Sequence, residues 1–410
     1  MKNIAVIGSM LTGNKGAASM LISLLNNLKE IGQEDCVVNC LTIFYQEDKR
    51  FNFYQNLNLI RCSPFDLICI AMPLSVIYFL FGWIFPIKKL LIQNRVLKTI
   101  YNSDLVVNMA GISYSDGRGL VLLYNIACDI TPIMMKSRVY KFSQAIGPFK
   151  NFFNRISAKL ILPRIKKIAA RGDMTAASLN GLELNNYELC PDGAFSMSIE
   201  KAYVTREITN ICERLKNSKK LKIGVAPSSV VEKYCSKINI SYTALMAEFI
   251  QKISSDVKYE VVLFPYSGIQ NRKTKKNNDL FITKEIYEKI NNIDIFYLDK
   301  EHSAEDVNFL ITNLDVLVTS RYHAMVISLS NGVIPLIIGW SHKYFETLNQ
   351  FDVMELCINY SSLDINILET RFTDLIINKD SYKEKIVSRL PKIKEKSFRN
   401  FIIIKEMLEN

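Results

Sequence analysis

The 410-residue sequence has few of the residues that build metal centres or disulfide frameworks. It contains only three histidines, His302, His323 and His342, which is too few for a His-built metal site, and it has no H-E-x-x-H motif. Its nine cysteines are odd in number and include no C-x-x-C pair. Together with an N-terminus that does not resemble a secretory leader, this pattern predicts a cytoplasmic protein with reduced thiols and without a His-built metal site.

Nucleic-acid motifs are also missing. There is no aromatic RNA-recognition motif and no Cys/His finger, so we expect no nucleic-acid partner. Lys and Arg number 51 against 40 Asp and Glu, which gives a net charge of +11. An excess of this sign favours an anionic small substrate or an acidic membrane surface, and it does not decide between the two.

Apolar residues are plentiful, at 49% of the chain, and they fall into short buried-strand patterns separated by helical ones. This alternation predicts an α/β fold with parallel sheets. We expect two Rossmann-like domains, residues 1–205 and 206–385, facing a cleft, and a C-terminal helix over 386–410 that packs back on the first domain. The expected strands are Ile4–Ile7, Cys36–Phe44, Leu105–Met109, Val139–Ala145, Ile223–Ala226, Val261–Pro265, Ile295–Leu298, Val316–Thr319 and Ile334–Ile338.

Residues 67–87 contain no charge over 21 positions, long enough for a bilayer core at about 1.5 Å per residue. A span here would separate the strands 4–7 and 105–109 of one sheet, so we reject it. Pro73, Gly82 and Pro86 divide the segment into short pieces. Two interpretations remain, a buried helix pair and a shallow peripheral insertion at the inner face of a membrane.

Two turns follow expected strands in the first half. Gly8, Gly13 and Gly16 lack the G-x-G-x-x-G spacing and the Gly-Lys-Ser/Thr of a P-loop. They either allow a ligand to approach the backbone or form a tight turn, and Asn14 is suited to cap the following helix. Asp116 follows the strand 105–109, and it either accepts a proton from a sugar hydroxyl or caps a turn.

Arginines mark two further positions. Arg171 carries a rigid fork of donors suited to carboxylate or phosphate, and the neighbouring Asp173 is expected to cap a helix over 174–179. Arg321 and His323 coincide with the end of the strand 316–319 and the start of a helix, where an anion is favoured. His323 is also suited to proton transfer near neutral pH. Lys343 should lie on the same rim and add a positive charge.

These motifs, in this order and spacing, resemble those of the polysaccharide pyruvyl transferase family. The resemblance rests on Gly13-Asn14-x-Gly16, the turn from Gly111 to Asp116, Ser143-Gln144-Ala145-Ile146-Gly147-Pro148, Ala170-Arg171-Gly172-Asp173, Pro191-Asp192-Gly193-Ala194-Phe195 and Ser320-Arg321-Tyr322-His323-Ala324, followed by Gly332-Val333-Ile334-Pro335 and Lys343.

The resemblance implies a GT-B-like enzyme that takes phosphoenolpyruvate as donor substrate and forms a pyruvate ketal on a sugar of an exopolysaccharide or its precursor. It implies no metal and no cofactor. By the family's pattern, Arg171, Arg321 and His323 contact the donor, with the first domain on the acceptor side. We expect His323 as acid, Arg321 as a catalytic charge and Asp116 as base. The other expected substrate-binding residues are Gly13, Asn14, Asp192, Ser320 and Lys343.

Two other interpretations stay open. The same fold and a basic cleft would serve a GT-B glycosyltransferase that uses a nucleotide sugar. A non-catalytic membrane-associated assembly protein, anchored through residues 67–87, is the third. The acceptor sugar is not identified, and the apolar segment favours a lipid-linked one.

Overall fold

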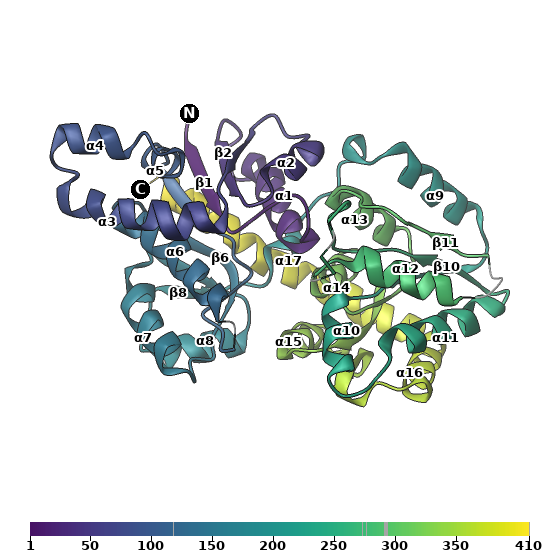
Figure 1. Ribbon diagram of the computed structural model, residues 1–410. Helices are drawn as coiled ribbons and strands as arrows, with labels where there is room; N and C mark the ends of the chain where they lie inside the picture. Colours follow the sequence, from purple (N-terminus) through teal and green to yellow (C-terminus); the bar gives the residue numbers. More distant parts are fainter. Residues whose placement is uncertain (118, 273, 276, 291–293, 410) are drawn as a thin grey trace. The chain divides into compact units, whose positions relative to one another are not determined.

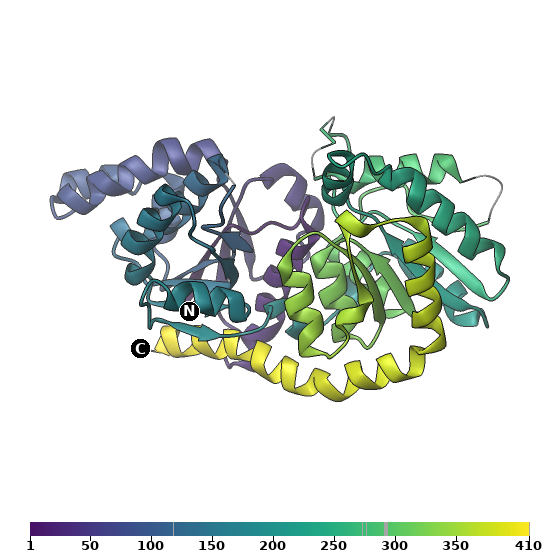
Figure 2. The ribbon, with the colours of Figure 1, turned by 90° about the horizontal axis from the view of Figure 1, so that it is seen from below.

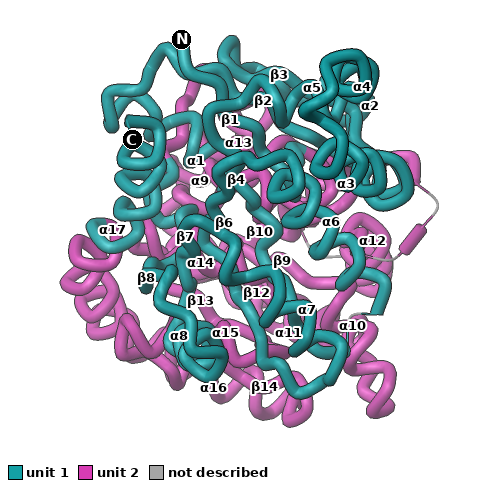
Figure 3. The backbone as a smooth tube through the Cα atoms, turned by 90° about the vertical axis from the view of Figure 1, so that its left-hand side faces the viewer, with its two compact units in different colours: residues 1–11, 20–197, 395–410 teal, residues 12–19, 198–394 magenta. Residues whose placement is uncertain are grey.

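A computed structural model describes residues 1–117, 119–272, 274–275, 277–290 and 294–409. The chain forms two compact units (Figure 3). Unit 1 holds residues 1–11, 20–197 and 395–410, and unit 2 holds residues 12–19 and 198–394. The chain therefore crosses between the units more than once.

A parallel sheet forms the centre of unit 1. Among the described residues it has eight strands in the order β3-β2-β1-β4-β6-β7-β8, with β5 paired to β6. The central strand β1 is a continuous apolar run with four fully buried residues, as expected of a strand covered on both faces. The strands are β1 (Asn3–Ile7), β2 (Val37–Thr42), β3 (Leu57–Arg61), β4 (Leu105–Asn108), β5 (Ile112–Ser113), β6 (Val139–Ile146), β7 (Lys167–Ala170) and β8 (Tyr187–Leu189).

Helices connect these strands and cover the sheet (Figure 1). They are α1 (Lys15–Glu30), α2 (Tyr45–Asp48), α3 (Met72–Phe81), α4 (Phe85–Leu91), α5 (Arg95–Tyr101), α6 (Leu120–Met134), α7 (Phe152–Ile161) and α8 (Asp173–Asn180). The first turn of α1 belongs to unit 2 and the rest of it to unit 1. Asp173 does not cap α8, contrary to the prediction, because the helix already begins at Asp173 and Gly172 occupies the cap position.

Unit 2 contains a second parallel sheet, in the order β11-β10-β9-β12-β13-β14. Its strands are β9 (Leu221–Ala226), β10 (Tyr259–Leu263), β11 (Phe296–Tyr297), β12 (Val316–Thr319), β13 (Ile334–Gly339) and β14 (Cys357–Asn359). Its helices are α9 (Arg206–Asn217), α10 (Ser229–Ser236), α11 (Tyr242–Ser255), α12 (Asp279–Lys289), α13 (Ala304–Thr312), α14 (Tyr322–Ser330), α15 (His342–Gln350), α16 (Ile365–Ile377) and the start of α17 (Lys379–Glu409). Both sheets follow the doubly wound order typical of Rossmann-like domains, which confirms the predicted α/β class.

The end of α17 packs on unit 1, as predicted for the C-terminal helix (Figure 2). Asn400, which is fully buried, donates to the carbonyls of Pro191 (3.0 Å) and Ser397 (2.9 Å). Its side-chain oxygen accepts hydrogen bonds from Tyr140 and from Ser143, at 3.2 and 3.1 Å. One amide thus joins the last helix to β6 and to the segment after β8.

Residues 67–87 form a turn of π-helix (Asp66–Ala71), then α3 and the start of α4. Part of the segment packs on the core of unit 1, through Leu67, Ala71 and Met72. Among the described residues, the structure contains no helix that is both long and apolar enough to span a membrane.

Replacing Asn400 by alanine tests the attachment of α17. We expect Asn400→Ala to lower the free energy of unfolding by about 2 kcal/mol, because it leaves buried partners without their hydrogen bonds. The urea midpoint followed by circular dichroism measures the change. Lys405→Ala, on an exposed side of the same helix, is the control and should cost less than about 0.5 kcal/mol. Equal losses for both variants would contradict a specific role for Asn400.

Candidate functional site

Unit 2 offers a ligand site where its strand order reverses, between β9 and β12. In open α/β sheets, ligands bind beyond the carboxyl ends of the strands at such a point. Ser228 and Ser229 follow β9, and the motif Ser320-Arg321-Tyr322-His323 follows the neighbouring β12. The motif predicted from sequence therefore lies at the position where this fold places its ligands.

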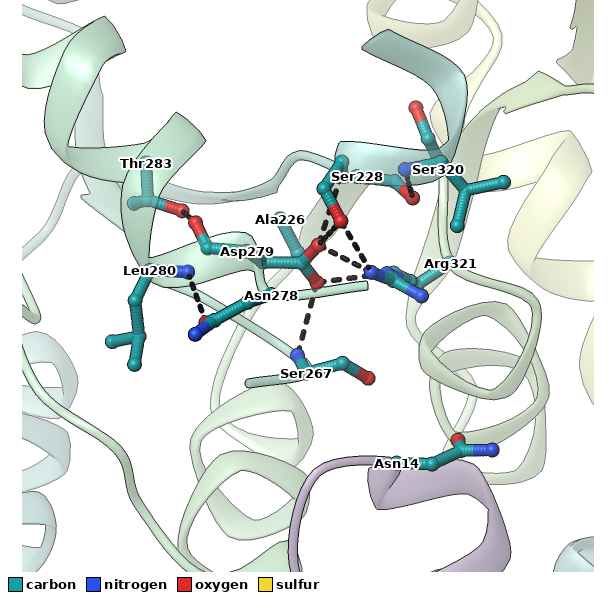
Figure 4. A network of polar contacts seen from close by, with 12 residues as sticks. Asn14, Ala226, Ser228, Ser267, Asn278, Asp279, Leu280, Thr283, Ser320 and Arg321 are labelled. Atoms are coloured by element: carbon teal, nitrogen blue, oxygen red, sulfur yellow. Dashed lines mark hydrogen bonds and ion pairs between the residues drawn. The ribbon is translucent and has the colours of Figure 1, made fainter. Parts of the chain in front are cut away.

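Arg321 is held by a buried carboxylate that the sequence analysis did not single out. Its Nε donates to Asp279 Oδ2 at 2.7 Å, and its Nη2 donates to Asp279 Oδ1 (Figure 4). The Asp279 side chain, fully buried at the start of α12, also accepts from the Ser229 amide (2.9 Å) and hydroxyl (3.0 Å) and from the Ser267 amide (3.0 Å). Burial opposes the charge of the guanidinium, yet Asp279 raises the pKa of Arg321 overall.

This pairing fixes which part of Arg321 faces a ligand. Asp279 and Ser229 use Nε and Nη2, whereas Nη1 donates no hydrogen bond to any residue in the described parts of the chain. The ion pair also balances the charge of the arginine. Arg321 therefore offers a ligand directed N–H donors rather than an uncompensated positive charge.

Ser320 anchors the backbone next to Arg321. Its hydroxyl lies 2.8 Å from the hydroxyl of Tyr242, and its carbonyl accepts from the hydroxyl of Tyr344 at 3.0 Å. The side chain of Ser320 is fully buried. These contacts fix the backbone from which Arg321 projects, and substrate contact by Ser320 stays a prediction.

His323 lies against the first turn of α1. A Cβ built on Gly16 would stand 1.9 Å from Nδ1 of His323, so the imidazole occupies the space of the missing side chain. Asn14 Oδ1 accepts from the Gly16 amide at 3.1 Å, which confirms that Asn14 caps the helix. Gly13, at φ +72°, adopts the left-handed conformation before it. The glycine motif and the Arg-x-His motif are thus parts of one cluster in unit 2.

A buried ion pair lies in the same first turn. Nζ of Lys15 is 3.5 Å from Oε1 of Glu301, and both side chains are only 2% exposed. Glu301 Oε2 also accepts from the Gln270 amide at 3.0 Å. Neither partner was predicted to be part of the site, because 286 residues separate them and no local pattern connects them.

Lys343 lies among three aromatic rings. Its Nζ is 4.6 Å from the ring centroid of Tyr322, 5.3 Å from that of Trp340 and 5.4 Å from that of Tyr344. Cation–π attraction of this kind restrains a lysine without neutralising its charge. Because Tyr322 stands between Arg321 and His323 in the chain, Lys343 lies next to the motif, and its role in substrate binding stays a prediction.

The candidate residues of unit 1 form a second group. Arg171, at the end of β7, donates from Nη1 to Asp192 Oδ2 at 2.8 Å, and both side chains are almost fully buried. Asp192 also accepts from the Ala194 amide at 3.0 Å. A Cβ on Gly111 would lie 4.0 Å from Nη1 of Arg171, so the turn after β4 passes close to this pair.

Asp116 is tied to the loop before α7. Its oxygens accept from the amides of Lys150 (2.8 Å) and Asn151 (3.1 Å) and from Asn154 Nδ2 (2.9 Å). Partial burial acts to raise the pKa of Asp116, but these hydrogen bonds outweigh it and the pKa is lowered. The structure thus contains the turn-stabilising contacts that were one of its two expected roles, and its role as a base stays a prediction.

A polar network beneath this turn was not predicted either. Lys141 Nζ is 2.7 Å from Oδ2 of Asp129, and both side chains are fully buried. Asp129 also accepts from Asn108 Nδ2 (2.7 Å) and from the Tyr114 hydroxyl (2.8 Å). The network joins the end of β4 to β6 and α6, and thereby fixes the turn that carries Asp116.

The predicted site residues thus form two groups. Unit 2 brings together Gly13, Asn14, Ser320, Arg321, His323 and Lys343. Unit 1 contains Asp116, Arg171 and Asp192. The prediction that both groups face one cleft stays a prediction.

Comparisons with known proteins agree with the motifs and with the fold. The sequence profile of the family described as polysaccharide pyruvyl transferase matches residues 14–342. No curated protein sequence matches the chain. Three solved structures are similar in fold across nearly their whole length. The first is UDP-GlcNAc 2-epimerase from Neisseria meningitidis bound to UDP-GlcNAc, with a TM-score of 0.63, 12% identity and 100% of both chains covered. The second is a putative UDP-N-acetylglucosamine 2-epimerase from Listeria monocytogenes, with a TM-score of 0.64, 12% identity and coverage of 100% of this chain and 97% of that one. The third is the Anabaena protein HepE in complex with UDP-glucose, with a TM-score of 0.55, 9% identity and coverage of 100% of this chain and 98% of that one. At these identities the likeness shows a GT-B-like fold and no more.

The contact between Gly16 and His323 is open to a double-mutant test. Gly16→Ala should lower the free energy of unfolding by about 1–3 kcal/mol, because the new methyl group and the imidazole overlap. His323→Ala in the same chain makes room, so the double variant should lose less than the sum of the single losses. Urea denaturation of all four proteins measures the coupling.

Gly181→Ala is the matched control. Gly181 has φ −65°, and a Cβ there meets nothing closer than 3.5 Å, so this variant should be as stable as the parent or slightly more so. Strictly additive effects of Gly16→Ala and His323→Ala would show that the two residues are not in contact.

Proposed function

The chain belongs to the polysaccharide pyruvyl transferase family, and we propose that it transfers the enolpyruvyl group of phosphoenolpyruvate to a sugar of a surface polysaccharide or its precursor. The products would be a pyruvate ketal and inorganic phosphate. The observation that carries the proposal is the cluster at the end of β12, where Arg321 donors, the start of α14 and Lys343 come together beside His323.

The donor has two anionic groups, a phosphate and a carboxylate, and the cluster supplies donors suited to both. Arg321 contributes Nη1, held in direction by Asp279. Helix α14 begins at Tyr322 without a side-chain cap among the described residues, so the positive end of its dipole faces the same place. We assign Arg171, with its guanidinium oriented by Asp192, to the same donor.

The chemistry then requires one acid and one base. His323 protonates the methylene carbon of the enol, which becomes a methyl group and leaves an oxocarbenium-like centre. One sugar hydroxyl attacks this centre and gives its proton to Asp116. The bond from carbon to phosphate oxygen breaks, the second hydroxyl closes the ketal, and its proton leaves with the phosphate. Catalysis in this scheme comes from positioning and charge stabilisation.

For the acceptor we propose a sugar, presented in lipid-linked form. The support is the exposed apolar side chains of α3 and α4, which suit a protein that works where lipid carriers are found.

A nucleotide-sugar glycosyltransferase is the second candidate, because the similar solved structures include proteins bound to UDP-GlcNAc and UDP-glucose. The two candidates differ in the donor. Phosphate release from phosphoenolpyruvate in the presence of an acceptor supports the first, and sugar transfer from a nucleotide sugar without phosphoenolpyruvate supports the second.

Donor binding gives a direct test without a known acceptor. Phosphoenolpyruvate should raise the melting temperature, because a ligand that binds the native state stabilises it by mass action. Arg321→Lys should weaken this binding on the order of 10- to 100-fold, since an ammonium cannot reproduce the planar fork. Arg389→Lys, on the exposed part of α17, is the control and should bind as the parent does. A shift with UDP-sugars and none with phosphoenolpyruvate would contradict the proposal.

The base assignment has its own test. Asp116→Asn should lower kcat by about 100-fold with a confirmed acceptor, and leave the affinity for phosphoenolpyruvate unchanged. Phosphate release at saturating donor and acceptor measures kcat. Because Asp116 also holds the loop before α7, Asn151→Ala, which disturbs the same loop, is the comparison variant. If both variants lose stability to a similar degree and both retain turnover, Asp116 is a structural residue.

A further inference from the structure

Helices α3 and α4 expose large apolar side chains that proteins usually bury. Trp83, in the link between the two helices, is 82% exposed, Phe85 74% and Leu90 68%. The pair extends outward from the sheet of unit 1 in two views (Figures 1 and 2). The pair is anchored to the core through a few residues only, among them Tyr78 of α3 and Ile87 and Leu91 of α4. Several large, exposed apolar side chains on one helix pair are typical of an interaction site.

Neighbouring helices also expose large apolar side chains. Helix α6 packs against both α3 and α7, so the three helices are adjacent. Leu120, at the start of α6, is 82% exposed, and Phe152 and Phe153, at the start of α7, are 69% and 72% exposed. Basic residues alternate with these side chains in α7, which contains Arg155 and Lys159 and no acidic residue. We call the exposed side chains of α3, α4, α6 and α7 the apolar–basic surface.

The net charge of the chain is concentrated in the same part of the sequence. Residues 65–172, which include all four helices, contain 15 Lys and Arg against four Asp and Glu, a net charge of +11. The rest of the chain contains 36 residues of each sign and is neutral. Between Asp66 and Asp104 there is no acidic residue, whereas Lys88, Lys89, Arg95 and Lys98 follow the exposed aromatic residues.

We propose that the apolar–basic surface docks on an anionic lipid membrane, with α3 and α4 lying in the plane of the interface. Exposed tryptophan and phenylalanine suit the boundary between headgroups and acyl chains, and lysines beside them suit acidic headgroups. In-plane insertion also agrees with the length of the helices. Helix α3 has ten residues and reaches about 15 Å, half of a bilayer core.

Charge argues for lipid over a second copy of this chain. Two copies that met through this surface would bring the segments of net charge +11 together, and like charges repel. An anionic membrane is complementary to both the apolar and the basic part of the surface. The proposal does not depend on the identity of the donor or on any catalytic step.

Tryptophan fluorescence tests the docking directly, because the chain has only two tryptophans, Trp83 and Trp340. In the Trp340→Phe protein, Trp83 is the only indole. Vesicles of phosphatidylcholine with 30% phosphatidylglycerol should shift its emission to shorter wavelength, and lipids brominated near the headgroup end of the acyl chain should quench it. Vesicles of pure phosphatidylcholine should bind much more weakly, and added salt should release the protein.

Variants separate the apolar from the basic contribution, with sedimentation of the full-length protein with vesicles as readout. Lys88→Gln with Lys89→Gln should weaken binding to the anionic vesicles roughly 25-fold, since each lysine near such a surface contributes about fivefold. Phe85→Ala should also weaken it. The controls remove two lysine charges and one exposed apolar side chain from unit 2. Lys284→Gln with Lys289→Gln, and separately Val257→Ala, should leave binding within about twofold of the parent.

Three results would overturn the proposal. The first is unchanged Trp83 emission and no sedimentation with anionic vesicles. The second is equal weakening by the unit 1 and unit 2 lysine variants, which would show unspecific attraction. The third is a dimer in solution, without lipid, that Trp83→Ala dissociates, which would assign the surface to a second copy.

Discussion

Pairing of each candidate-site arginine with a buried aspartate is the constraint on which the proposed chemistry depends. Arg321 with Asp279 in unit 2, and Arg171 with Asp192 in unit 1, are held in fixed directions by carboxylates that accept further backbone hydrogen bonds. Removing one member of such a pair would leave the other buried without compensation. Each aspartate neutralises the charge of its arginine and, in return, fixes the direction of the guanidinium N–H groups. For a donor with two anionic groups, directed N–H groups select an orientation, which diffuse charge does not.

The sequence predicted the framework well because buried parallel strands are continuous apolar runs. All nine expected strands are present, with ends shifted by at most two residues. Five of the described strands were not predicted. Three of them, β3, β8 and β14, lie at sheet edges and contain polar residues, as in Tyr187–Leu189. The other two are short, since β5 has two residues and β7 has four and begins with a lysine. Asp279 and Glu301 were missed for another reason. Their partners, Arg321 and Lys15, are 42 and 286 residues away, and a pairing made only by the folded chain has no local pattern.

The glycine motif was a weak signal in the sequence, and its contact with the Arg-x-His motif explains it. Gly13, Asn14 and Gly16 fit a ligand-binding turn and an ordinary turn equally well in the sequence. In the structure Gly16 lies where the His323 imidazole leaves no room for a side chain, and Asn14 fixes the helix start that brings it there. The second motif therefore explains why the first has a glycine at position 16. The two motifs are about 300 residues apart in the chain and in contact in the fold.

Finally, the residues that give the chain its net charge are mostly not those of the candidate anion site. At the level of composition, +11 suits an anionic substrate and an acidic membrane equally. Near the end of β12 the arginine is balanced by Asp279, and the nearby Lys15 is balanced by Glu301, so oriented donors and a helix end shape the local field beside Lys343. Most of the excess lies instead in residues 65–172, a segment that also contains exposed aromatic side chains; of its basic residues, Arg171 belongs to the candidate site and is paired with Asp192. A small anion is selected by the geometry of a few atoms, whereas a membrane responds to charge summed over a surface. In this chain, accordingly, the arginines of the candidate site are paired with aspartates, whereas the excess of basic residues lies in the segment proposed to contact the membrane.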